Sequence, residues 1–423
     1  MNRYRVFGFS LLSLAATLTA CGGSGAKAGA SVRDSAGITI VENTDPVWGA
    51  SDAWVVVDSP TVQIGGDETN PLQDLAQASG ALRLRDGRLV VVNGATSEIR
   101  FYAPSGGHLS TTGRKGQGPG EFQMPAGLWP VEGDSLLVFD ALARRVTVIA
   151  PDGTTPRTYP LGGVTGAPIP VDGRVSMALP VGWFRDGGIL GMEQTFRIND
   201  PRSEAYRDTV SYLRFGPDGL VKDTVARLPG LEMTPMALSF GGQTFNTPSP
   251  VPLGRNTVVA GRDSTVYLAT NDAYQIEVRG LDGKVQRLIR MLSSPVPITA
   301  ADQDAHRKET LEEFESGPTA GLVPGPMKEQ INKHIAEAAY PSHFAPLVEM
   351  RFDADGFLWA QESPRPGTGI RTYAVFDTAG VFLGRVTMPK DFAPTWFGEK
   401  ELVGIWQDAD QVQYVRAYPL RKP

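Results

Sequence analysis

Residue types that bind metals or act as nucleophiles are scarce in this chain. Its 423 residues contain one cysteine and four histidines: Cys21, His108, His306, His334 and His343. A single cysteine excludes disulfide frameworks, cysteine-rich zinc sites and iron–sulfur clusters. No histidine has a second ligand at the short spacing of a zinc site, and no Gly-x-Ser-x-Gly elbow supplies a nucleophile. The sequence therefore predicts no catalytic residue and no metal ligand.

Cys21 lies in an N-terminal targeting segment. Arg3 and Arg5 precede the apolar stretch 6–17, which is too short to span a bilayer. The run 18–21, Leu-Thr-Ala-Cys, is followed by glycines and a serine, and it resembles a bacterial lipobox. In that motif the cysteine becomes the new N-terminus and is acylated, with palmitate among its lipids. A plain secretory signal with an unrelated cysteine is the alternative.

The lipobox resemblance implies an order of segments. Residues 1–20 are then a signal peptide, residues 21–35 a lipidated flexible tether, and residues 36–423 the folded part. A lipid membrane is the expected partner through acylated Cys21. Gly22 in place of an aspartate resembles the sorting pattern for the outer membrane. We therefore expect a lipid-anchored protein of the cell envelope, at the outer membrane on its periplasmic or surface side.

The glycine-rich segment 113–120 could be mistaken for a phosphate-binding loop. The P-loop pattern requires Gly-Lys-Ser/Thr at the start of a helix, whereas this segment leads through Pro119 to another strand. A tight connection between two sheets, with Phe122 wedged between them, is the prediction. Arg114, Lys115 and Glu121 lie on this connection and are candidate ligand-facing residues, as is His343. A solvated ion pair is the alternative for the three on the connection.

Composition narrows the class of protein. Hydrophobic residues make up 41% and charged residues 20%, as in soluble globular proteins. The net charge of −6 and the pI of about 5.4 argue against nucleic acid as a partner, because phosphate binding requires a basic surface. The 48 glycines and 33 prolines predict many tight turns and short strands.

A unit of four short strands joined by turn dipeptides recurs along the chain. It is found at residues 82–113, 126–160, 180–227, 256–290 and 346–387. The turns at Gly87 and Gly107 are 20 residues apart, as are those at Gly133 and Gly153. Residues 394–418 form a sixth unit of three strands, which residues 54–64 can complete, and residues 38–41 can add a strand near that closure. The sequence predicts an all-β, six-bladed β-propeller closed by strands from both termini.

The segment 112–122, Thr-Gly-Arg-Lys-Gly-Gln-Gly-Pro-Gly-Glu-Phe, resembles the NHL repeat, together with Leu-Leu-Val-Phe-Asp at 136–140. The chain is most similar to the bacterial lipoproteins described as six-bladed β-propellers. This resemblance implies the fold and leaves the activity open. NHL-type zinc lyases use histidines in the central cavity, and lactonase-type propellers bind calcium there. The sequence predicts no cofactor for this chain, but a calcium or zinc ion in the central cavity stays an open alternative.

Residues 298–340 interrupt the repeat with two helical patterns, the first capped by Thr299 with Asp302. His334 lies on the apolar side of the second helix, so we expect it to be buried.

The irregular segments 194–207, 228–255, 293–345 and 362–369 are expected on one rim of the propeller, and the other rim is expected to carry only tight turns. We expect the insert over or beside the channel mouth on the irregular rim, near Arg114, Lys115 and His343. Packing against the outer side as a brace is the alternative. The charged residues of 200–208 indicate a solvated loop.

These observations favour a monomeric, non-enzymatic binding module for a protein, peptide or glycan, with no nucleic-acid partner. A metal-dependent hydrolase or lyase of the lactonase or amidating-lyase propeller type is the alternative function.

Overall fold

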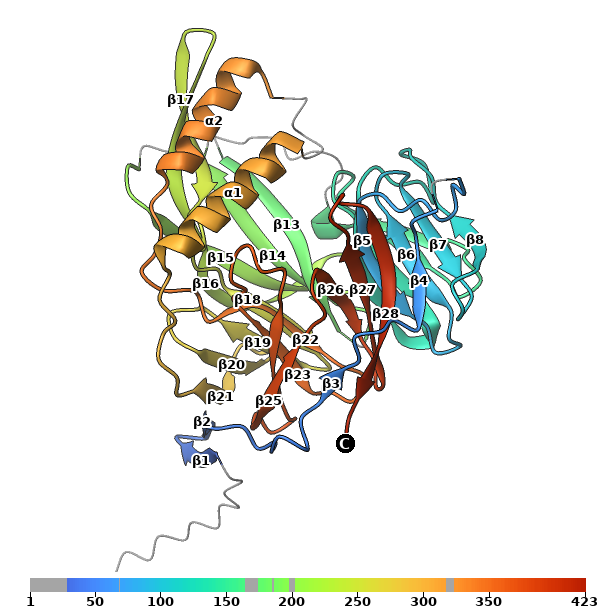
Figure 1. Ribbon diagram of the computed structural model, residues 1–423, viewed down its shortest axis with the longest axis horizontal. Coiled ribbons are helices and arrows are strands. Elements are labelled where there is room, and N and C mark those ends of the chain that lie inside the picture. Colours follow the sequence, from blue (N-terminus) through green and yellow to red (C-terminus); the bar gives the residue numbers. More distant parts are fainter. Residues whose placement is uncertain (1–28, 68, 164–173, 185, 198–201, 317–322) are drawn as a thin grey trace, which may run out of the picture.

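The computed structural model describes residues 29–67, 69–163, 174–184, 186–197, 202–316 and 323–423 (Figure 1). Within these residues the fold is nearly all β, with six separate sheets and two α-helices. No helix of the described part is long and apolar enough to cross a membrane. Cys21 lies outside the described residues. We number the six sheets by the chain order of their first long strands.

The strands of each sheet follow one another along the chain. The first sheet holds β5 (Ala78–Arg83), β6 (Leu89–Asn93), β7 (Glu98–Tyr102) and β8 (His108–Thr112). The second holds β9 (Pro125–Pro130), β10 (Leu136–Asp140), β11 (Arg145–Ile149) and β12 (Arg157–Pro160), with short 3₁₀ turns at Glu132–Asp134 and Leu161–Gly163. The third holds β13 (Arg174–Trp183), β14 (Ile189–Arg197), β15 (Tyr206–Phe215), β16 (Val221–Phe240) and β17 (Gln243–Pro250).

The other three sheets repeat this pattern. The fourth holds β18 (Val258–Arg262), β19 (Thr265–Ala269), β20 (Gln275–Gly280) and β21 (Val285–Met291), extended by β2 (Ile38–Asn43) and β1 (Ala30–Ser35). The fifth holds β22 (Leu347–Phe352), β23 (Leu358–Glu362), β24 (Thr372–Phe376) and β25 (Phe382–Thr387). The sixth holds β26 (Phe392–Phe397), β27 (Glu401–Gln407) and β28 (Gln413–Arg421), extended by β3 (Val55–Val56) and β4 (Val62–Ile64).

Tight turns join the strands because aspartate and glycine supply the local geometry. In the first turn the Asp86 carboxylate accepts the backbone N–H of Arg88 at 3.0 Å, and Gly87 has φ of 92°. A side chain makes that φ unfavourable, so the turn requires glycine at this position. These turns occur where the dipeptide spacing predicts them.

Six buried clusters each combine side chains of two sheets. Through them every sheet packs against the next one along the chain, and the sixth sheet packs against the first. In the cluster between the first and second sheets, Phe122 is fully buried with Phe101 and Val138. The predicted wedge of Phe122 between two sheets is therefore observed.

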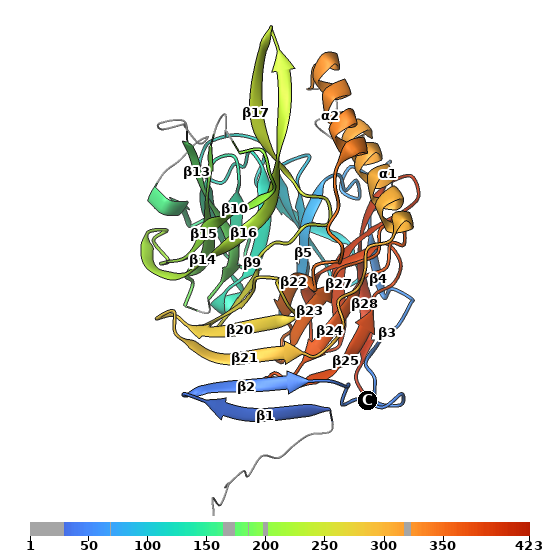
Figure 2. The same ribbon diagram turned by 90° about the vertical axis from the view of Figure 1, so that its left-hand side faces the viewer.

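The segment predicted to complete the sixth unit lies where the sequence places it. β3 and β4 pair antiparallel with β28, which leaves Ile64 fully buried (Figure 1). Residues 38–41 form the predicted strand, but their predicted position is wrong: β2 pairs in parallel with β21 in the fourth sheet, and β1 lies outside it at the edge (Figure 2). The buried Asn43 explains this position, because its amide bonds the carbonyl of Gly380 at 3.1 Å and the N–H of Phe382 at 2.8 Å.

The third sheet carries a projecting ribbon. Residues 228–255, predicted to be irregular, instead form a hairpin in which the end of β16 pairs with β17. Gly241 and Gly242 have φ of 60° and 79°, which two-residue hairpin turns require. Both views show this ribbon projecting from the fold beside α2 (Figures 1 and 2).

The insert forms α1 (Ala300–Ser316) and α2 (Gly325–Glu337). As predicted, Thr299 caps α1: its hydroxyl and N–H donate to Asp302, whose own N–H donates back to the hydroxyl at 3.2 Å. Asp302 also accepts Arg365 from the β23–β24 connection at 2.7 Å. The Gln330 amide of α2 bonds both backbone groups of Ser239 on the ribbon. The helices thus bridge the ribbon of the third sheet and the β23–β24 connection of the fifth sheet.

Candidate functional site

One cavity touches the first strand of all six sheets. Its volume is about 780 Å³, and its lining includes residues 82 and 85, 128–131, 180–183, 256–263, 348–354 and 395–397. No residue of α1 or α2 lines it. Each first strand pairs with only one neighbour in its sheet, so its other edge is open to hydrogen bonds from outside the sheet, as where Thr395 bonds both backbone groups of Ala81.

Three tryptophans contribute to the lining: Trp129, Trp183 and Trp396. All three are partly buried. The rings of Trp129 and Trp183 lie 6.5 Å apart and are tilted by 44°, which presents two aromatic faces at an angle. Across the described part of the chain, none of the three indole N–H groups has a hydrogen-bond partner. The cavity is therefore lined by aromatic residues, as small-molecule sites are.

Glycines position two of these rings. A Cβ at Gly127 would collide with the ring of Trp129, and a Cβ at Gly398 with the ring of Trp396. Both indoles therefore fold back over a backbone that lacks a side chain. This packing leaves few alternative ring positions and fixes the cavity wall before any ligand arrives.

The charges around the cavity occur in pairs. Arg351 contacts Glu349 at 2.7 Å, and Arg262 contacts Asp263 at 3.3 Å. Asp353, whose side chain is fully buried, accepts the indole N–H of Trp359 at 3.1 Å and lies 3.4 Å from the Lys422 ammonium. Paired charges suit an uncharged ligand, because an ionic ligand would have to break a pair or remain unmatched.

Acid–base chemistry would require a titratable group with a shifted pKa. Tyr212 of the cavity lining is such a group: burial raises its pKa to about 12, and its hydroxyl donates to the carbonyl of Thr257 at 3.5 Å. A phenol held neutral in this way acts as a hydrogen-bond donor and does not serve as a base. In the described ranges, no three or more His, Cys, Asp or Glu residues gather as a metal-binding group.

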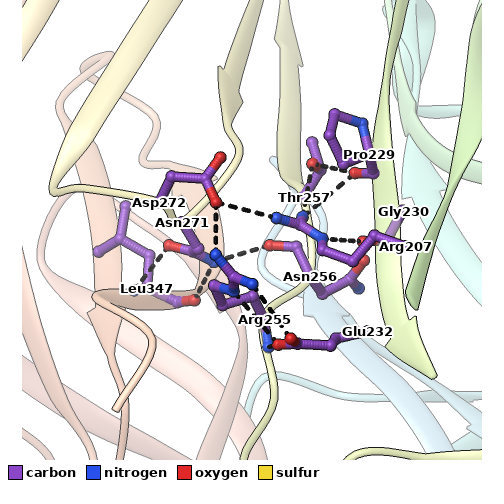
Figure 3. Close-up of polar contacts among 10 residues, drawn as sticks. All are labelled: Arg207, Pro229, Gly230, Glu232, Arg255, Asn256, Thr257, Asn271, Asp272 and Leu347. Carbon is purple, nitrogen blue, oxygen red and sulfur yellow. Dashed lines mark hydrogen bonds and ion pairs between the residues drawn. The ribbon is translucent and has the colours of Figure 1, made fainter. Parts of the chain in front are cut away.

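An ionic network supports the cavity wall where β18 begins (Figure 3). Arg207 donates to the carbonyl of Gly230 at 2.8 Å and contacts Asp272 at 3.3 Å. Arg255 contacts the same Asp272 at 2.8 Å and forms a second pair with Glu232 at 3.0 Å. The hydrogen bond from Arg255 lowers the pKa of Glu232, and burial lowers the pKa of Arg207.

For Arg207 this network corrects the prediction of a solvated loop at 200–208; Glu204 is exposed as predicted, and residues 200–201 lie outside the described residues. Arg207 is the second residue of β15, and only 9% of its side chain is exposed. Its guanidinium also donates to the carbonyl of Pro229 at 3.2 Å, so it satisfies two backbone acceptors of β16. These acceptors are distant in sequence, which explains why local charge patterning suggested exposure.

The predicted ligand-facing residues lie outside the cavity lining. Arg114 and Glu121 form an ion pair at 2.7 Å, in which 79% of the Arg114 side chain is exposed. The Gly118 N–H and then Arg114 lower the pKa of Glu121. Lys115 is exposed beside them. His343 is also exposed and bonds Ser342 at 2.9 Å.

The two histidines of the insert lie in different surroundings. His306 bonds the Tyr340 hydroxyl at 3.1 Å, and the two rings meet edge to face. His334 is partly buried, and it lines a separate cavity between α2 and the ribbon. Burial lowers the pKa of both histidines.

No protein-family model and no curated protein sequence matches this chain. Among solved structures, it is similar to a putative exported protein from Bacteroides fragilis, with 10% identity, a TM-score of 0.47, and 91% of this chain and 99% of that chain covered. A member of the DUF4221 family from Bacteroides vulgatus has 10% identity, a TM-score of 0.48, and 88% and 99% coverage. Virginiamycin B lyase from Staphylococcus aureus has 10% identity, a TM-score of 0.37, and 86% and 99% coverage.

Proposed function

We propose that the protein is a lipid-anchored, six-bladed β-propeller of the NHL-like type that binds a protein segment, peptide or glycan in the cavity between its sheets. The propeller is supported by six sheets whose first strands line one cavity. Closure is supported by the buried cluster between the sixth and first sheets and by the pairing of β4 with β28. A ring of this kind leaves its inner wall rigid, which favours a preformed site.

The observation that carries the binding role is the lining of the cavity. Partly buried tryptophans and paired charges offer stacking and hydrogen bonds without an unmatched acid or base. We propose that the protein holds its ligand unchanged, without a cofactor, and that it acts as a monomer at the envelope.

Replacing Trp183 by alanine tests this proposal. We expect soluble protein of residues 22–423 to bind the neutral fluorescent probe N-phenyl-1-naphthylamine, and Trp183→Ala to weaken binding about tenfold because an aromatic wall is lost. The measurement is a fluorescence titration, followed by displacement with peptide and oligosaccharide panels. Trp406→Ala removes an indole that does not line the cavity and should leave the affinity unchanged. Equal affinities for all three proteins would contradict a binding site in the cavity.

Metal analysis of the same protein distinguishes the hydrolase or lyase alternative. Stoichiometric calcium or zinc that survives purification, together with cleavage of a lactone or peptide-like substrate, would replace the binding role by a catalytic one. We expect substoichiometric metal and no turnover.

The membrane anchor has an independent test. Cys21→Ser is expected to abolish incorporation of radiolabelled palmitate and to leave the protein soluble or uncleaved at this position, because the acylated sulfur is removed. Labelling and membrane fractionation of cells measure this result. Absence of label from the unaltered protein would refute the lipoprotein assignment.

A further inference from the structure

The cavity is displaced toward the turns that follow the first strands. In β5, β9, β13 and β26 only the end near that turn contributes to the lining, through residues such as Leu82, Val131 and Trp183. Turn residues themselves take part, among them Arg85 and Ala354. We call the side on which these turns gather the turn face. α1 contacts the β23–β24 connection at the opposite ends of the strands, and α2 contacts the ribbon. In the described part of the chain neither helix lines the cavity, so we place its entrance on the turn face.

A second hollow adjoins the cavity on the turn face. Its volume is about 380 Å³, and it is lined by Thr61, Trp396, Glu399, Lys400, Glu401 and Pro419. Trp396 lines both spaces, so its indole is a shared wall between the cavity and this outer groove. The groove follows the sixth sheet outward from β26 toward Thr61, which precedes β4. A ligand that occupies both spaces must be an extended chain.

The chemistry of the walls selects between a peptide and a glycan. A peptide bound as an added strand needs backbone N–H donors along a free strand edge. Pro130 and Pro180 line the cavity on two of these edges and remove such donors. Indole faces suit the flat, C–H-rich faces of sugar rings, while free indole N–H groups and the polar residues of the groove can bond hydroxyls. The paired charges of the cavity disfavour an anionic chain in that part of the site.

We propose that this site takes a linear, uncharged oligosaccharide, which enters at the turn face, stacks on Trp129 and Trp183, and continues over Trp396 into the outer groove. This inference rests on the proposed binding function and adds the ligand class, the face of entry and the path.

The test is isothermal titration calorimetry of the full chain in detergent with neutral cello-, xylo-, malto- and chito-oligosaccharides of increasing length. We expect one series to bind, with an affinity that rises with length until cavity and groove are filled. Thr61→Arg should block the groove and remove the gain from length, a loss of about tenfold for the longest member. Ser59→Arg, exposed two residues earlier and outside the groove, is the matched control. Melting curves verify that both variants are folded.

The outcomes distinguish the proposed binding function from the ligand class and path proposed above. Binding that is independent of length and insensitive to Thr61→Arg would overturn the path while the binding role stands. Binding of peptides but no oligosaccharide would overturn the ligand class. No binding of any panel member or of the naphthylamine probe to folded protein would overturn both this inference and the proposed function.

Discussion

Ile64→Asp is expected to lower the free energy of unfolding by about 3–5 kcal/mol, because it buries an unpaired carboxylate. Ile64 is fully buried in the cluster that joins the sixth sheet to the first, and its strand β4 pairs with β28. The chain has no other described strand in that position, so the loss cannot be relieved by an alternative partner. Urea titrations followed by fluorescence give the change in the unfolding midpoint.

The neighbouring residue provides the control. Gln63 lies on the same strand with its side chain exposed, and it bonds Arg416 at 2.8 Å. Gln63→Asp introduces the same charge and should cost less than about 1 kcal/mol. A chain that begins at residue 66 lacks the whole strand and should aggregate through the unpaired edge of β28. Equal midpoints for Ile64→Asp and Gln63→Asp would show that β4 does not contribute to the core.

Turn chemistry made most of this fold predictable. Dipeptides such as Asp86-Gly87 fix a strand end locally, and the hydrophobic strands between them leave few alternatives. Pairing between distant segments is not encoded in this way. The sequence of β2 fits any open sheet edge, and contacts with distant residues place it in the fourth sheet: Glu42 pairs with Arg290 of β21, and Asn43 bonds Gly380 between β24 and β25.

The candidate site was less predictable for the same reason. Arg114, Lys115 and Glu121 stand out locally because they are charged residues in a glycine-rich loop, yet they are solvated. Trp129, Trp183 and Trp396 lie in ordinary strands, and the cavity that they share exists only when six sheets meet. The one available signal was that all three lie on the first strand of a unit, near its first turn. This position indicates a binding site only once the cavity is known.

Asn271→Ala is expected to lower the free energy of unfolding by about 4 kcal/mol, because it leaves two buried backbone groups of Leu347 and the partly buried carbonyl of Asn256 without partners. Asn271 follows β19 and is 3% exposed. Its amide donates to the carbonyls of Asn256 at 2.8 Å and Leu347 at 2.7 Å, and its oxygen accepts the Leu347 N–H at 3.1 Å (Figure 3). The side chain therefore connects the segment that enters β18 to the start of β22, both of which lead into the cavity wall. Chemical denaturation measures the loss.

Two further substitutions separate backbone strain from the hydrogen bonds. Asn271 has φ of 65°, a left-handed conformation that costs alanine about 1 kcal/mol and glycine almost nothing. Asn271→Gly should therefore be about 1 kcal/mol more stable than Asn271→Ala while still losing every side-chain bond. Asn271→Asp keeps the acceptor for Leu347 N–H but turns an anionic oxygen toward two carbonyls, so it should be the least stable of the three. If Asn271→Asp instead retained the stability of the unaltered protein, the two donated bonds would contribute nothing, and the connection between β18 and β22 would have to depend on packing alone.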